Sequence, residues 1–305
     1  MKFPNRNIQI KNNITIDIIR LGGDQMFGQC HTWAARTILG ISLLASLGPF
    51  QPGSAEQPEW ADDPVAREIM QKVDDRDDGD NVRSTLEMIL IDKRGHKRVR
   101  RLRSLRKEKG PDSYSLLFFL SPPDVQDTGF MTYDYDDPER DDDQWLYLPA
   151  LKKTKRIASS GKSGAFMGSD ISYADLTDRP LEYYDYKLLK EDRIGEYAVW
   201  VIEAVPNNED EIKETGYTRV IQFIRQDNYV PIRAKIWLRR GGRKKYMEVK
   251  ELAQIDGIWM TTLMTMTTKK GKKTEHKTIL RTSDIEFDQP LEFDTFTVRG
   301  LEAGP

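Results

Sequence analysis

The sequence predicts a mainly β protein of the α+β class, built on one large, curved antiparallel sheet with a few covering helices. Two observations support this prediction: apolar and polar residues alternate along many segments, as in half-buried strands, and glycine-containing turns separate these segments. In addition, only one segment has a clear helix start. Because no internal repeat or linker divides the chain, we expect a single domain after an N-terminal leader.

The predicted helix begins directly after Asp63. The Asp63 side chain can cap a helix, and proline suits the first helical position that Pro64 would occupy. An acidic loop at 74–80 would end this helix. Its predicted apolar face consists of Val65, Ile69 and Val73.

Period-2 alternation predicts strands through most of the remaining chain, for example at 86–90, 232–238 and 259–266. The segment 158–181 is rich in Gly and Ser and lacks alternation, so a loop or a short lid helix is expected there. The C-terminal third is predicted to be an up-and-down meander of long strands.

Two basic turns of this meander, near Gly241-Gly242 and near Gly271, should lie at the same edge of the sheet because successive strands reverse direction. The turn between them, at Asp256-Gly257, should lie at the opposite edge. We interpret the basic edge either as soluble hairpin tips or as a rim that meets anionic headgroups or an acidic partner. The predicted rim comprises Arg239, Arg240, Arg243, Lys244, Lys245, Lys269, Lys270, Lys272 and Lys273.

Composition excludes several classes of protein. With 47 Lys+Arg against 49 Asp+Glu, the 305-residue chain lacks the positive charge of a general nucleic-acid binder. A mean hydropathy of -0.64 excludes a multispanning membrane protein. One cysteine excludes a disulfide framework. The basic stretch 93–109 is therefore interpreted as a solvated face or a contact for anionic lipid rather than for nucleic acid.

The N-terminal region is predicted to be an export leader. The apolar run at 38–47 is too short to span a bilayer and fits the core of a signal peptide. Small residues at 53–55 predict cleavage between Ala55 and Glu56. We therefore assign 1–55 to the signal-peptide region, with Met26 as an alternative start, and 56–305 to the exported domain, which we expect in the periplasm.

Sequence motifs for catalysis, cofactors and metals are weak. No nucleophile elbow surrounds a serine, and Gly161-Lys162-Ser163 lacks the first glycine of a phosphate loop, because Arg156 stands there. The acidic runs at 74–79 and 134–143 are interpreted as solvated loops, because the first lacks the Glu that a calcium loop needs at its twelfth position. We predict no catalytic residue, no cofactor and no metal, and hence no enzyme.

Apolar residues on the predicted strands form the candidate ligand cavity. Methionine and aromatic side chains make adaptable walls for a flexible apolar ligand, although an ordinary core would contain the same residues. The candidate cavity residues are Leu86, Met88, Leu90, Phe118, Met131, Tyr133, Trp145, Tyr147, Met260, Met264 and Met266.

Five short motifs resemble the LolA-like family of outer-membrane lipoprotein-sorting proteins. They read FLSPPDV, DQWLYLPALKK, KRI, FMGSD and YADL, and they lie at 119–125, 143–153, 155–157, 166–170 and 173–176. The resemblance covers roughly 64–301. It implies an open, incomplete β-barrel closed by helices, with an apolar cavity for acyl chains. In the best-studied carriers a strand arginine holds the lid; the possible equivalents here are Arg98, Arg100, Arg101 and Arg103.

The resemblance implies a periplasmic carrier that binds lipid or lipoprotein acyl chains and transfers them toward the outer membrane. Its partners would be an inner-membrane transporter of the efflux (RND) type and an outer-membrane acceptor. Two alternatives are a lipid-responsive sensor that docks on a membrane protein and a hydrolase that acts on the cell envelope. The residues alone do not distinguish these three hypotheses.

Overall fold

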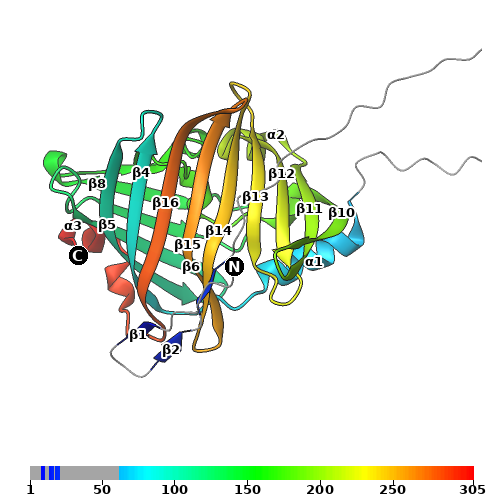
Figure 1. Ribbon diagram of the computed structural model, residues 1–305. Helices are drawn as coiled ribbons and strands as arrows, with labels where there is room; N and C mark the ends of the chain where they lie inside the picture. The colour runs from blue at the N-terminus through cyan, green and yellow to red at the C-terminus, as the bar shows by residue number, and fades with distance from the viewer. Residues whose placement is uncertain (1–7, 11–13, 17, 21–61) are drawn as a thin grey trace, which may run out of the picture.

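A computed structural model describes residues 8–10, 14–16, 18–20 and 62–305. Its main feature is one antiparallel sheet, and the strands follow a single path that does not close (Figure 1). In spatial order the strands are β10 (Tyr184–Ile194), β11 (Tyr197–Pro206), β12 (Tyr217–Arg225), β13 (Pro231–Leu238), β14 (Arg243–Ile255), β15 (Ile258–Lys270), β16 (Lys273–Glu286), β4 (Val82–Asp92), β5 (Lys97–Lys109), β6 (Asp112–Ser121), β7 (Gly129–Asp134), β8 (Asp143–Leu148) and β9 (Lys153–Arg156).

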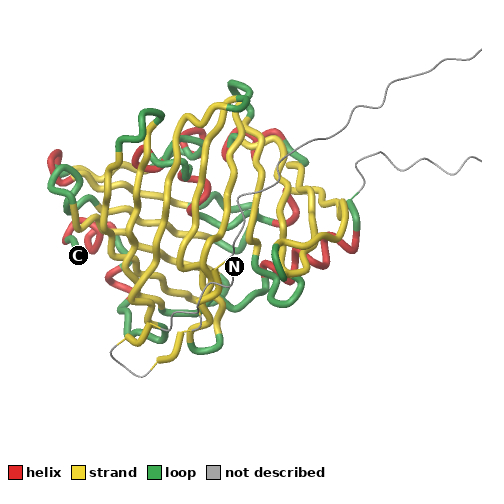
Figure 2. The backbone as a smooth tube through the Cα atoms, in the orientation of Figure 1, coloured by secondary structure: helices red, strands yellow, loops and turns green. Residues whose placement is uncertain are grey.

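The sheet is strongly curved. In Figure 2 the strands at the back run across those at the front, so the two halves of one sheet face each other. Because β10 and β9, at the two ends of the path, do not pair with each other, the result is the open, incomplete barrel that the resemblance implied. The C-terminal meander is also confirmed: β13 to β16 are consecutive antiparallel neighbours.

Helix α1 (Pro64–Asp74) begins as predicted, with the Asp63 carboxylate accepting hydrogen bonds from the backbone N–H groups of Val65 and Ala66. Its buried face matches the prediction at Ile69 and at Val73, which packs against the same cluster, but not at Val65. Ala66, Ile69 and Met70 are buried, whereas Val65 is 54% exposed. The contact face of the helix is thus rotated by about one residue, because Ala66 and Met70 pack against β10 and β11.

The segment from 149 to 183 contains five short 3-10 turns in place of a regular lid helix. These turns are η1 (Pro149–Leu151), η2 (Ser159–Gly161), η3 (Phe166–Gly168), η4 (Tyr173–Leu176) and η5 (Leu181–Tyr183). Two further short helices were not predicted. Asn208 caps α2 (Glu209–Thr215) and Thr297 caps α3 (Val298–Ala303), which follows η6 (Phe293–Thr295).

Short strands also occur near the N-terminus. β1 (Ile8–Ile10) pairs with β2 (Ile14–Ile16), and β3 (Ile18–Arg20), within the predicted leader, pairs with β14. The apolar run 38–47, the cleavage site between Ala55 and Glu56, and Met26 lie outside the described residues, so the leader stays a prediction. Within the described residues, no helix combines the length and apolarity needed to cross a bilayer.

Candidate functional site

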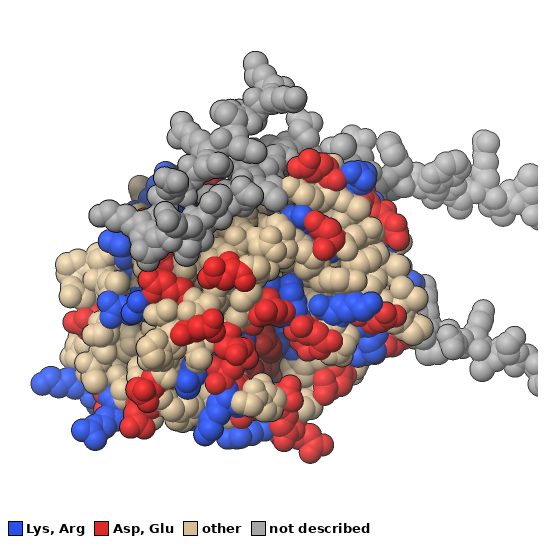
Figure 3. All heavy atoms as spheres, turned by 90° about the horizontal axis from the view of Figure 1, so that it is seen from below, with Lys and Arg blue, Asp and Glu red and all other residues tan. Residues whose placement is uncertain are grey.

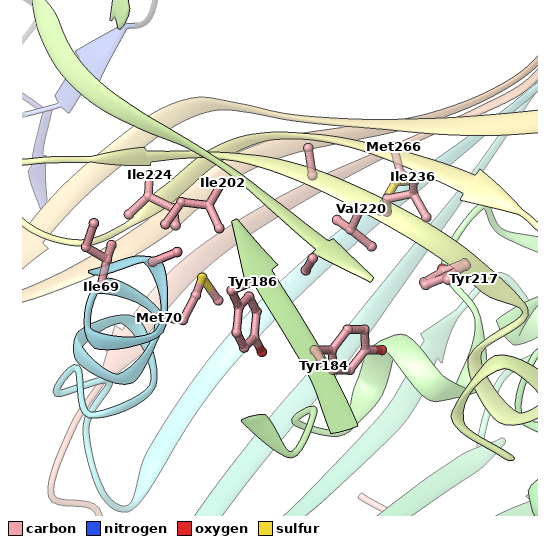
Figure 4. Close-up of a cluster of buried hydrophobic side chains, with 13 residues drawn as sticks. Ile69, Met70, Tyr184, Tyr186, Ile202, Tyr217, Val220, Ile224, Ile236 and Met266 are labelled. Atoms are coloured by element: carbon pink, nitrogen blue, oxygen red, sulfur yellow. The ribbon is translucent and has the colours of Figure 1, made fainter. Parts of the chain in front are cut away.

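The candidate site is the inner face of the sheet, which we define as the face packed against α1 and against the segment 157–183, hereafter the lid. Met70 of α1 lies beside Tyr186 of β10, whereas Ile69 points toward Ile224 of β12, and all four side chains belong to one buried cluster (Figure 4). Further along the sheet, Phe166 of the lid is fully buried against Phe119 and Phe130. Apolar side chains therefore line most of this face, and two separate segments cover it.

Five of the predicted cavity residues lie together on the inner face. Their strands are brought together by β16, whose Thr278 lies between Leu90 and Met266, while its Leu280 lies between Met88 and Met264. Period-2 alternation then places the fifth residue of the set, Leu86, on the same side. All five pack in the two clusters that contain α1 and the lid.

The other six predicted cavity residues lie outside these two clusters. Five of them pack on the outer face of β6, β7 and β8, under Phe296 and Leu301 of the C-terminal segment. Because both faces of these strands are apolar, alternation alone could not show which side points inward; the inner residues are Phe119, Phe130 and Leu146. The five outer residues are Phe118, Met131, Tyr133, Trp145 and Tyr147; the sixth, Met260, packs in a separate cluster with Ala253, Ile255 and Phe287.

A strand arginine ties the lid to the sheet. Arg100 of β5 is buried, and its guanidinium donates a hydrogen bond of 2.5 Å to the backbone carbonyl of Met167 in η3. Burial and the nearby charge of Arg98 lower the pKa of Arg100. The neighbours Arg98, Arg101 and Arg103 are exposed. Of the four possible equivalents, Arg100 is therefore the one that reaches the lid.

A second tie centres on Asp170 of the lid. Its buried carboxylate accepts hydrogen bonds from Thr268 Oγ1 on β15, at 2.5 Å, and from Thr278 Oγ1 on β16, at 2.7 Å. It also lies 2.6 Å from Nδ1 of His276. Asp170 thus links the lid to two adjacent strands near the centre of the sheet.

A third tie is a buried ionic cluster around Asp175. Its carboxylate accepts hydrogen bonds from Tyr217, at 2.7 Å, from Arg179, at 2.7 Å, and from Lys245, at 3.2 Å. Burial would raise the pKa of Asp175, but the charges of Lys245 and Arg179 outweigh it and lower the pKa to about 2. Burial lowers the pKa of Lys245. Asp175 and Arg179 belong to the lid, whereas Tyr217 and Lys245 belong to the sheet. Opening the lid would therefore separate Asp175 from Lys245, and a buried charge without a partner is costly.

Lys245 corrects the predicted rim. It points to the inner face, where it is 7% exposed, because it lies opposite Ile236 and Thr268, which also face inward. Sequence reasoning also assigned no role to Asp170 or Asp175. Asp170 lies in the FMGSD motif and Asp175 in the YADL motif. These motifs indicated the family resemblance, but they did not indicate that the two carboxylates hold the lid.

Two hollows adjoin the lid. The smaller, of about 250 Å³, lies between α1, the lid and β10 to β12, and Met70, Val73 and Val220 form part of its apolar wall. The larger, of about 1020 Å³, is rich in carboxylates, many of them from the predicted acidic loop at 134–143 and from α2. Figure 3 shows acidic side chains gathered around a hollow on the lower face. Burial and the neighbouring Asp178 raise the pKa of Asp134 to about 8.

The acidic loops are mostly exposed, as predicted for solvated turns: Asp75, Asp77, Asp136 and Asp137 are exposed, whereas Asp134 is half-buried and accepts a hydrogen bond from the backbone N–H of Asp178. Among the described residues, no three His, Cys, Asp or Glu side chains are arranged to hold a metal ion. Lys162, from the incomplete phosphate-loop motif, is buried and donates a 2.5 Å hydrogen bond to Glu214 of α2. It serves as a further contact of the lid.

Comparisons with known proteins agree with the open-barrel fold. A protein from Vibrio parahaemolyticus, described as an outer membrane lipoprotein-sorting protein domain, is 33% identical with a TM-score of 0.70. A DUF1329 family protein from Desulfovibrio piger is 28% identical with the same TM-score. Each alignment covers 78% of this chain and 98% of the other. The chain belongs to the LolA-like lipoprotein-sorting family.

Two further comparisons are consistent with this assignment. A LolA superfamily protein from Nitrosomonas europaea shares the fold, with 18% identity, a TM-score of 0.57, and coverage of 77% of this chain and 98% of the other. A family model described as "uncharacterized protein" matches residues 111–303. No curated protein matches the chain.

Proposed function

We propose that this protein is a carrier that binds the acyl chains of lipids or lipoproteins between the inner face of its sheet and its lid, and moves them across the periplasm toward the outer membrane. One observation carries the proposal: an apolar sheet face is covered by a segment with little regular structure, which three polar ties hold in place. A permanent core would not require a cover of this kind.

The free energies of two states, the closed lid without cargo and the displaced lid with a bound acyl chain, should be comparable in a carrier. Each polar tie contributes about 1–3 kcal/mol to closure, and opening would also expose buried lid residues such as Phe166, whose apolar contacts a bound acyl chain would replace. Each methylene removed from water contributes about 0.8 kcal/mol, so about ten methylenes would contribute roughly 8 kcal/mol. An acyl chain can therefore displace the lid, and its departure allows the lid to close again.

Membership of the LolA-like family and the description of the Vibrio relative support this direction of transfer. We infer that a transporter of the inner membrane donates the cargo and that an outer-membrane component accepts it. Export with cleavage between Ala55 and Glu56 belongs to the same proposal. N-terminal sequencing of the periplasmic protein should then begin at Glu56; a full-length cytoplasmic product would contradict export.

The direct test is to purify the protein from its native periplasm and analyse extracted lipid by mass spectrometry. We expect intact lipid or lipoprotein in a stoichiometric amount. Recovery of cleaved lipid products, with turnover of added substrate, would instead support a hydrolase. Protein that carries no lipid and binds no added acyl chain would contradict the proposal.

A fluorescent fatty-acid probe locates the binding face. Met264→Asp places a carboxylate on the inner face and should abolish probe binding, because an isolated carboxylate disfavours an acyl chain. Tyr147→Asp makes the same change on the outer face and should leave the affinity unchanged. Circular dichroism confirms that both variants are folded. Equal binding by wild type and folded Met264→Asp would exclude the inner face.

A further inference from the structure

Three hairpin tips lie at one edge of the sheet. The β13–β14 and β15–β16 turns are neighbours there, since Arg243 lies opposite Lys270, which in turn lies opposite Lys273. The β4–β5 turn joins them, because His276 near the start of β16 lies opposite Asp92 at the end of β4. Figure 1 shows these tips together at the upper end of the long strands. The third tip was not part of the predicted rim.

The three tips carry a dense positive charge, and most of its side chains are exposed. The exposed cations are Lys93, Arg94, Lys97, Arg98, Arg239, Arg240, Arg243, Lys270, Lys272 and Lys273. Lys244 and Lys269 are half-buried beside them. Acidic neighbours compensate only locally: Glu209 lies 3.5 Å from Arg239, and Asp92 lies 3.0 Å from His96.

Two aromatic rings contact lysines on the strands that carry these tips. Lys235 and Lys244 lie over the ring of Trp237, at 4.6 and 5.2 Å from its centroid, and Lys269 lies 5.2 Å from that of Tyr246. Trp237 and Tyr246 are both half-buried. Aromatic rings beside lysines are typical of protein surfaces at the headgroup level of a membrane.

We propose that this edge, hereafter the basic edge, docks on the anionic surface of a phospholipid membrane. The tips span six adjacent strands, about 24 Å at the usual strand spacing. The cations stand on separate projecting turns rather than around a pocket, so they fit an extended sheet of negative charge better than a single acidic ligand. Acidic side chains gather on the face seen from below, which would point away from such a membrane (Figure 3).

This proposal stands on the charges of the edge and does not depend on the cargo beneath the lid. A protein that holds lipid but ignores vesicles would overturn the docking proposal alone. A protein that binds vesicles but never holds lipid would overturn the carrier proposal alone. The two can thus fail separately.

The test is co-sedimentation with vesicles of equimolar phosphatidylglycerol and phosphatidylcholine, and with vesicles of phosphatidylcholine alone. We expect wild type to bind only the anionic vesicles, and raised salt to weaken binding because it screens exposed charges. Lys270/Lys272/Lys273→Gln should lower the partition constant about 100-fold, since each cation near the surface contributes about fivefold.

The matched control is Lys152/Lys153/Lys155→Gln, which removes the same charge near β9, four strands beyond β5 on the sheet path. It should bind anionic vesicles as wild type does. Absence of wild-type binding, or equal loss in the two triple variants, would overturn docking by the basic edge. An edge that binds only an acidic protein, and no vesicle, would overturn it as well.

Discussion

The guanidinium of Arg100 lies 2.5 Å from the carbonyl oxygen of Met167, so a strand in the middle of the sheet holds the backbone of the lid directly. This contact uses a main-chain oxygen and therefore does not depend on which side chain stands at position 167. Opening the lid leaves a buried cation without its acceptor, and water must enter the inner face to solvate it. The tie therefore sets part of the free energy of lid opening.

We predict that Arg100→Gln loosens the lid without unfolding the sheet. A hydrogen bond to a charged group contributes about 1.5–3 kcal/mol, so the open population should rise about tenfold or more. Hydrogen exchange at the Phe166 amide, which is bonded to Ile171 within the lid, would report this change. Arg101→Gln is the control because Arg101 is exposed. Equal exchange in the two variants would show that Arg100 does not hold the lid.

The sequence predicted the sheet better than it predicted the site. Alternation at 86–90 identified the inner side of β4 because its outer side is more polar, whereas β6 carries apolar residues on both faces. Side-chain pattern cannot separate two buried faces; only the covering C-terminal segment does so, and α3 is too short to predict by periodicity.

The lid ties escaped sequence reasoning for a different reason. Asp170, Asp175 and Lys245 belong to residue types that usually lie in solvent, and their burial depends on contacts between segments far apart in the chain. In β14, Lys245 follows Lys244, so one of two adjacent lysines had to face inward. Because the β13–β14 tip is rich in Arg and Lys, sequence composition predicted that all of its cations would be exposed.

We predict that the ionic cluster around Asp175 is strongly coupled. Lys245→Met should lower the free energy of unfolding by about 3–5 kcal/mol, because it removes one partner of a buried carboxylate. Lys244→Met should cost less than about 1 kcal/mol, since that side chain is half-buried on the other face. Urea unfolding measures both. The double variant Asp175→Asn/Lys245→Met should lose less than the sum of the single losses; additive losses would contradict coupling.

We predict that Asp134 makes the protein less stable as pH rises. Its pKa is about 8 in the folded protein and near 4 when unfolded, so the folded chain binds more protons between these values. The free energy of unfolding should therefore fall with increasing pH over this window, by on the order of 1 kcal/mol per pH unit.

Asp134→Asn removes this titration and keeps an oxygen that can accept the hydrogen bond from the Asp178 backbone N–H. The variant should be more stable than wild type at pH 8, and its advantage should disappear near pH 4. Asp136→Asn, at an exposed position of the same loop, should show no such advantage. A pH-independent difference between Asp134→Asn and wild type would contradict the burial of this carboxyl.

The last prediction separates the structural face of the sheet from the binding face. Phe296 of the C-terminal segment is fully buried against the outer face of the sheet, and its carbonyl accepts a 2.5 Å hydrogen bond from the Tyr133 hydroxyl. Phe296→Ala should lower the free energy of unfolding by about 3–5 kcal/mol, because it leaves a cavity among packed rings. Val298→Ala, at a 40% exposed position, should change it by less than about 0.5 kcal/mol.

Neither substitution should change the affinity for the fatty-acid probe, since the outer cluster around Phe296 includes no residue of the lid. The measurement is a probe titration at a temperature where Phe296→Ala remains folded. If that folded variant lost probe binding while Met264→Asp retained it, the acyl chains would lie between the sheet and the C-terminal segment. If only Met264→Asp lost probe binding, the acyl chains would lie under the lid. The lid can move while the aromatic cluster around Phe296 stays closed.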